Sequence, residues 1–92
     1  MKINGFYSKP GDTVVTVTAS VHPGDVVSYF SEGRQCEAVA VNDIPKFHKM
    51  AVEPKKKGEP VKKYGERIGV ALKDFAPGEH VHTHNLGARE EA

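Results

Sequence analysis

Three histidines alternate along one short segment near the end of the chain, which reads His80-Val81-His82-Thr83-His84-Asn85. In a regular strand, side chains two residues apart share a face and lie about 7 Å apart along it. Two such imidazoles can bind one metal ion, but His80 and His84 would lie about 13 Å apart, too far for all three to bind the same ion. The spacing therefore predicts at most two metal ligands here. The alternative is a solvated polar face of the strand.

Other side chains suited to chemistry are few. His22 lies beside a turn, and spacing alone predicts that both it and His48 are ordinary surface histidines. Cys36 is the single cysteine, so an internal disulfide and any multi-cysteine metal site are excluded. The chain has neither a phosphate-binding nor a dinucleotide-binding glycine motif.

Basic side chains concentrate between residues 46 and 67, where eight Lys and Arg face three Glu, although the whole chain carries a net charge of only +1. One interpretation is a solvated lysine-rich surface that protects strand edges. The other is a local positive field for an anionic ligand such as a carboxylate or sulfonate. A nucleic-acid partner is not expected, because Tyr64 is the only aromatic residue in the densest basic run.

The elements that position these residues are predicted by a recurring pattern of Pro or Lys, Gly, an acid, any residue and Val. It occurs at residues 10–14, 23–27, 57–61 and 77–81. Proline presets φ at the second position of a turn, and glycine supplies the positive φ that a type II turn needs at the third. The pattern predicts four similar tight turns, each followed by a strand.

Between the turns, alternating and β-branched runs predict about seven short strands, at residues 15–19, 26–31, 37–41, 49–52, 61–64, 68–72 and 79–86. Valine and isoleucine far outnumber leucine, and at most one helical turn is expected, at residues 45–48. We therefore predict a single all-β domain over residues 1–92, with a polar tail at about 87–92.

Location and association follow from the same composition. No run reaches the roughly 18 apolar residues of a membrane span, so no membrane association is expected. The first thirty residues lack the apolar core of a secretory signal, and a cytoplasmic protein is predicted. A chain of 92 residues builds a thin core, which favours function with a partner chain or as a homo-oligomer.

Residues 42–86 resemble the SAF (β-clip) domain of the altronate and galactarate dehydratases. The landmarks are Asp43-Ile44-Pro45, His48-Lys49, Gly58-Glu59-Pro60-Val61, Lys63-Tyr64-Gly65, Ile68-Gly69 and the histidine segment. Each motif is short, but their order and spacing together are specific. One departure stands out: the family usually has glycine before the His-Lys pair, and this chain has Phe47.

The resemblance implies the small subunit or N-terminal module of a sugar-acid dehydratase. Such a chain would help a large catalytic subunit eliminate water from a small anionic sugar acid, altronate or galactarate, to give a 2-dehydro-3-deoxy acid. The implied cofactor is a divalent metal: iron, manganese or magnesium. The resemblance assigns catalytic roles to His48, His82, His84 and Asn85, with His82 and His84 as metal ligands and His80, the outermost histidine, contributing least. It assigns substrate binding to Lys49, Lys63 and Tyr64.

Two alternatives remain at this point. The small subunit of (2R)-sulfolactate sulfo-lyase has much the same pattern, and that enzyme eliminates sulfite rather than water. SAF-like domains also occur as non-catalytic binding modules in pilus and flagellar assembly proteins and in antifreeze proteins. Such modules would not need the histidine segment.

Overall fold

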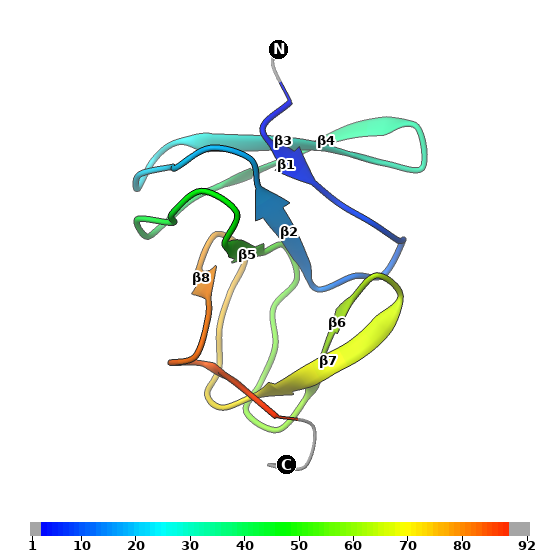
Figure 1. Cartoon of the computed structure of the whole chain (residues 1–92), viewed down its shortest axis with the longest axis vertical. Coiled ribbons are helices and arrows are strands. Elements are labelled where there is room, and N and C mark those ends of the chain that lie inside the picture. The colour runs from blue at the N-terminus through cyan, green and yellow to red at the C-terminus, as the bar shows by residue number, and fades with distance from the viewer. Residues whose placement is uncertain (1–2, 89–92) are drawn as a thin grey trace.

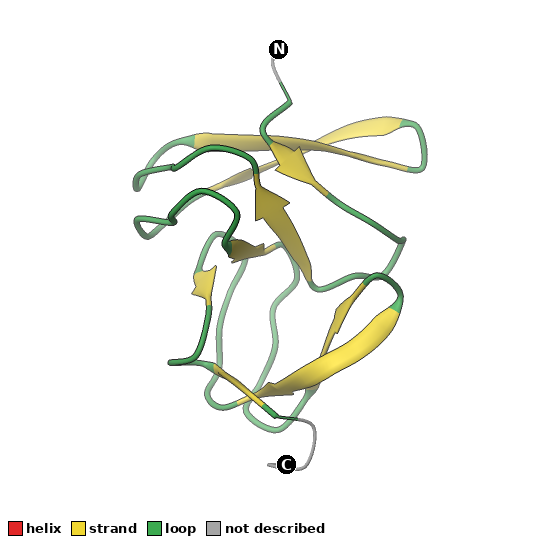
Figure 2. Cartoon of the chain, in the orientation of Figure 1, coloured by secondary structure: helices red, strands yellow, loops and turns green. Residues whose placement is uncertain are grey.

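The computed structural model describes residues 3–88, and within this range the chain consists of short strands and loops without a helix (Figure 2). The predicted all-β class is confirmed. The strands are β1 (Gly5–Phe6), β2 (Val14–Val17), β3 (Val26–Ser31), β4 (Arg34–Val39), β5 (Lys49–Ala51), β6 (Pro60–Lys63), β7 (Glu66–Ala71), β8 (His80–Val81) and β9 (Leu86–Gly87). Residues 45–48 form a turn rather than a helical turn, in which the His48 N–H donates to the Pro45 carbonyl over 3.0 Å. In the same described range, no helix is long and apolar enough to cross a membrane.

The strands form three small antiparallel sheets. A four-stranded sheet of order β1-β2-β5-β8 lies in the middle, the β3–β4 hairpin lies at the N-terminal end of the molecule, and the β6-β7-β9 sheet lies at the opposite end (Figure 1). Val15 and Val17 of β2 pack into one apolar cluster, whereas Val14 packs into a second one. Strand β2 is therefore covered on both faces.

The recurring turns form as predicted. In each one, the N–H of the acidic residue donates to the carbonyl three positions earlier, and the acid's side chain accepts from the N–H of that earlier residue. The four acids are Asp12, Asp25, Glu59 and Glu79. Their preceding glycines have φ between 87° and 95°, the left-handed region that glycine adopts freely. Each acid thus stabilises its own turn.

Asp12 does more than close its turn, because it is fully buried and reaches the turn between β6 and β7. Its carboxylate accepts hydrogen bonds from the backbone N–H groups of Tyr64 and Gly65, over 3.0 and 2.9 Å. Tyr64 has a φ of 60°, an unfavourable value for a side chain of this size. The buried carboxylate therefore holds Tyr64 in a backbone conformation that it would otherwise avoid.

The folded part of the chain extends one residue further toward the C-terminus than predicted. Gly87, predicted as the start of a polar tail, belongs to β9 and pairs with Val70. Gly69 permits this approach, because a side chain there would collide with the Gly87 carbonyl oxygen. The rest of the predicted tail beyond residue 88 lies outside the described residues.

Candidate functional site

The histidine segment does not form the continuous strand predicted for residues 79–86. Only His80 and Val81 are in β8, and the chain then turns before β9 begins at Leu86. The cause is Asn85, which is 2% exposed. Its Oδ1 accepts from the His82 N–H and its Nδ2 donates to the His80 carbonyl, both over 2.9 Å. An asparagine side chain that binds the local backbone in this way competes with strand pairing.

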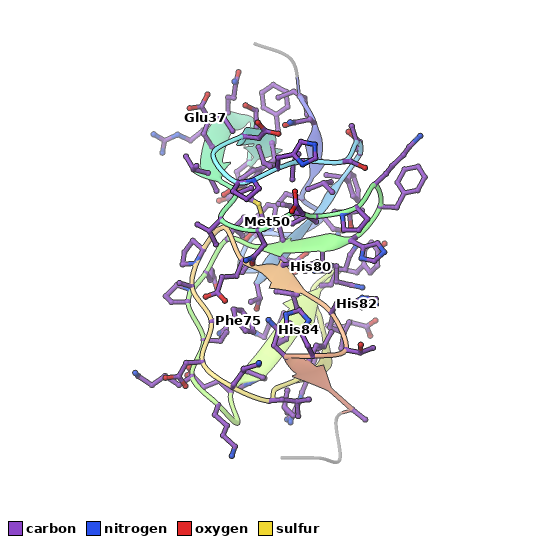
Figure 3. The ribbon with its side chains drawn as sticks, turned by 90° about the vertical axis from the view of Figure 1, so that its left-hand side faces the viewer. Glu37, Met50, Phe75, His80, His82 and His84 are labelled. Carbon is purple, nitrogen blue, oxygen red and sulfur yellow. The ribbon has the colours of Figure 1, made fainter. Side chains whose placement is uncertain are left out.

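This turn gathers imidazole rings that a strand would have kept apart. The rings of His80 and His82 are stacked with centroids 5.5 Å apart, and the His84 ring lies 5.5 Å from that of His80 (Figure 3). A fourth ring comes from the residue before β5, since that of His48 lies 4.6 Å from His82 and 5.2 Å from His80. Pairing of β5 with β8 brings His48 here across 32 residues of sequence.

Three of the four histidines are placed to share one ion. Nδ1 of His48 lies 3.0 Å from Nε2 of His80, and one ring nitrogen from each of His48, His80 and His82 lies within 4.8 Å of the others. We call these three residues the histidine group. His84 lies beside the group without belonging to it. The geometry thus favours a ligand set that contains His80, whereas the sequence had predicted His82 with His84.

The backbone before His48 explains the departure from the family pattern at Phe47. Phe47 has a φ of 68°, in the region where glycine is favoured, so it preserves the conformation that the usual glycine would adopt. This conformation costs of order 1–3 kcal/mol, and two backbone hydrogen bonds stabilise it. Phe47 N–H donates to the Val17 carbonyl over 2.8 Å, and Val17 N–H donates to the His48 carbonyl over 3.0 Å. His48 is therefore fixed against β2.

Within the histidine group, His80 favours its neutral form. Burial lowers the pKa of His80, and the neighbouring charges of His48, His84 and His82 lower this pKa further. Below its ordinary value of 6.5, this pKa leaves the ring unprotonated at neutral pH. An unprotonated imidazole is the form that binds a metal ion.

The other predicted site residues form a second group, which we call the lysine–tyrosine group: Lys49, Lys63 and Tyr64. Lys63 is only 6% exposed, and its Nζ lies 3.7 Å from the centre of the Tyr64 ring. Hydrogen bonding to Lys63 and the charges of Lys63 and Lys49 lower the pKa of Tyr64. The three side chains are therefore neighbours, as the sequence predicted.

The two groups come from different elements, except that Lys49 directly follows His48. Along β5, alternation places Lys49 on the face opposite His48 and Met50. In Figure 1, the β6–β7 turn that carries Tyr64 lies on the opposite side of the molecule from β8. The sequence had grouped all these residues around one substrate, and for Lys49, Lys63 and Tyr64 that role stays a prediction.

The sequence of this chain matches a known family of protein domains. The family model for the altronate/galactarate dehydratase SAF domain matches residues 4–89. The chain belongs to this family. This SAF domain is 44% identical over 55 residues to (2R)-sulfolactate sulfo-lyase subunit alpha from Paracoccus pantotrophus, an alignment that spans 60% of this chain and 82% of that one. It is 38% identical over 74 residues to altronate dehydratase from Escherichia coli, spanning 80% of this chain but only 14% of the relative.

A third relative is, like the first, a short subunit that is matched over most of its length. The sulfolactate sulfo-lyase subunit alpha from Chromohalobacter salexigens is 31% identical over 74 residues, which is 78% of this chain and 79% of that one. The SAF domain thus matches most of two short subunits and a small part of a long dehydratase. All three relatives carry the names of lyases or dehydratases, so the predicted relation to this class of enzyme is confirmed.

His22 is exposed as predicted, but it has a partner. Its Nδ1 lies 2.6 Å from Oδ1 of Asp43, because a backbone bridge between Val21 and Ile44 places the two side chains next to each other. The hydrogen bond to Asp43 and that residue's charge raise the pKa of His22, and the Asp25 charge raises it further.

We expect NMR titration of this SAF domain to give His22 a pKa above 6.5, and Asp43→Asn to lower it toward that value. A group whose pKa is raised by folding stabilises the folded state below its unfolded pKa, and this contribution is lost as pH rises through the folded pKa. Glu37→Gln is the control, because Glu37 does not contribute to the raised pKa of His22. An unaltered His22 pKa in the variant would contradict the pairing.

Proposed function

We propose that this SAF domain is a non-autonomous subunit or module of a lyase that eliminates water from altronate or galactarate, and that the histidine group is its contribution to the active site. The main support for this proposal is the convergence of three imidazoles, because a non-catalytic binding module would not need such a cluster. In the reaction, a base removes the proton from the carbon next to the carboxylate. The bond from the adjacent carbon to its hydroxyl oxygen then breaks, and that hydroxide leaves as water after it is protonated.

The histidine group fits a divalent metal. Two ligands about 2.1 Å from one ion lie about 3.0–3.4 Å apart, and the nitrogens of His48 and His80 are 3.0 Å apart. Imidazole ligands suit iron or zinc, whereas magnesium and manganese prefer oxygen. Among the three predicted ions, the donor set therefore favours iron. A bound divalent ion would supply positive charge against the negative charge that develops on the substrate.

His84 is the candidate for proton transfer in this proposal. It is exposed and lies beside the histidine group, so its imidazole can approach a substrate without being a member of the ligand set. A protonated imidazole can give a proton to the leaving hydroxide. Asn85 has a different role in this proposal, because both ends of its buried amide are occupied by the turn. It positions the histidines.

Elimination of sulfite from (2R)-sulfolactate is the second candidate. It is supported by length, since the alignments cover 82% and 79% of two sulfo-lyase alpha subunits but only 14% of the Escherichia coli dehydratase. Both candidates remove a proton next to a carboxylate, and they differ in the leaving group. In either case we propose that a second, larger subunit completes the site.

The test is to purify the chain from the cells that make it, to identify the subunit that accompanies it, and to assay the complex on altronate, galactarate and sulfolactate. We expect the complex to dehydrate altronate or galactarate, and the isolated chain to be inactive on both. Release of sulfite from sulfolactate alone would establish the second candidate. Isolation of the chain without a partner and without activity on any of the three acids would contradict both.

The lysine–tyrosine group allows a separate prediction. The predicted binding of the substrate carboxylate by Lys49, Lys63 and Tyr64 would require these residues to lie near the histidine group. Because the β6–β7 turn lies across the molecule from β8 (Figure 1), we expect Lys63→Met in the assembled enzyme to change KM for the acid by less than about threefold. The measurement is steady-state kinetics, with Lys56→Met as an exposed control. A rise in KM with unchanged kcat would restore the predicted role, since it marks lost binding of the ground state and transition state alike.

A further inference from the structure

A pocket of about 350 Å³ opens beside the histidine group and includes His80 in its lining. Its volume is at the lower end of the roughly 300–1,000 Å³ range of ligand pockets, which suits a small molecule. Val21 and Ile44 line it and are almost fully buried, so they give it a firm apolar base. The adjoining loop is tied to β8, because the His80 N–H donates to Oδ1 of Asn42 over 2.9 Å.

The polar side chains of this pocket retain hydrogen-bonding capacity. His22 and Asp43 bind each other through Nδ1 and Oδ1, which fixes the orientation of both groups. Within residues 3–88, no partner is found for Nε2 of His22 or for Oδ2 of Asp43. Ser20 Oγ accepts from the Lys46 N–H over 3.2 Å, so its hydroxyl proton remains to be donated. The pocket therefore offers both donors and acceptors next to one another.

The charge of the pocket distinguishes between classes of ligand. No lysine or arginine is among the described residues that line it, whereas Asp43 contributes a carboxylate. A second anionic group, such as the sulfonate of sulfolactate, would meet this carboxylate without a compensating cation other than His22. Vicinal hydroxyl groups, which both donate and accept, match the available partners.

We infer that this pocket binds the hydroxylated tail of a polyhydroxy acid, with Asp43, His22 and Ser20 as the residues that contact it. This inference rests on the proposed function and deepens it, since it selects altronate, whose tail carries only hydroxyl groups, over sulfolactate and over galactarate, whose second carboxylate would meet Asp43. A ligand held here would reach the histidine group through His80, the residue that belongs to both.

The test is a titration of the full chain, followed by amide NMR spectra, with three probes: the neutral polyol ribitol, altronate and sulfolactate. We expect altronate and ribitol to shift the amide resonances of Val21, Asp43 and Ile44, and sulfolactate to leave them in place. Asp43→Asn should weaken altronate binding about tenfold, the scale of a hydrogen bond to a charged group. Glu37→Gln is the matched control, because this exposed carboxylate on β4 is not part of the pocket lining and lies away from His80 (Figure 3).

Two results would overturn the inference. One is the absence of shifts at these residues with both altronate and ribitol. The other is equal altronate affinity in Asp43→Asn and the wild-type chain. A His48→Ala variant distinguishes a failure of the pocket inference from a failure of the proposed function, because His48 belongs to the histidine group but not to the pocket lining. Loss of metal binding in His48→Ala with intact polyol shifts would support the pocket, whereas polyol shifts without metal binding in the wild-type chain would contradict only the proposed metal site.

Discussion

Replacement of His80 with alanine is expected to lower the affinity of the chain for iron(II) or zinc(II) by at least about 100-fold, which is the upper end of what loss of an outer-shell partner costs. His80 supplies the nitrogen closest to that of His48, and its lowered pKa keeps it ready to bind a metal at neutral pH. The measurement is calorimetry with zinc(II), or competition with a chelator. Turnover of the assembled enzyme should fall in parallel.

His84→Ala is the matched control for this experiment, because it removes an imidazole of the same segment that lies outside the histidine group. We expect it to change metal affinity by less than about threefold while it lowers turnover, as expected for a residue that transfers a proton. The ligand pair predicted from the sequence, His82 with His84, gives the opposite order, with a larger loss of metal affinity in His84→Ala and a milder effect in His80→Ala. The two variants together therefore decide between the two ligand sets.

Local chemistry made part of this fold predictable from the sequence. A Pro-Gly pair followed by an acid specifies a tight turn within four residues, and all four turns formed where the pattern placed them. The β-branched runs between them are strands because their side chains fit a pleated, half-buried surface. The histidine segment does not form the strand that its alternation predicts, because one asparagine stabilises a turn there. Asparagine favours turns, and this signal was present in the sequence at Asn85.

The site itself depends on long-range contacts that spacing does not reveal. His48 joins the histidine group only because β5 pairs with β8, and His22 meets Asp43 only through an isolated bridge between two loops. Resemblance to the family had marked His48 as a site residue, although its spacing alone indicated an ordinary surface position. Alternation along β5 also separates Lys49 from its neighbour His48, a consequence that becomes visible only once the strand boundaries are known.

Asn85→Ala is expected to lower the free energy of unfolding by about 2–4 kcal/mol, because each buried partner left unpaired costs about 1–3 kcal/mol. The His82 N–H would lose its acceptor and the His80 carbonyl would lose its donor. For a domain of this size, the Tm should fall by at least about 10 °C. Thermal and urea unfolding measure both quantities, and Thr83→Ala, an exposed change in the same turn, should cost less than about 0.5 kcal/mol.

The same variant separates a positioning role from a catalytic one. If Asn85 holds the turn, the folded variant at low temperature should bind metal about 10–100-fold more weakly, as is typical when the support of a metal ligand is lost. Asn85→Asp keeps an acceptor for the His82 N–H, but the ionised carboxylate has no donor for the His80 carbonyl, so at neutral pH the variant should recover only part of the stability; at acidic pH the protonated carboxyl can donate, and it should recover more. A catalytic asparagine would behave differently: turnover would be lost in Asn85→Ala while Tm and metal affinity stayed at their wild-type values. That result would return Asn85 to the role predicted from the sequence.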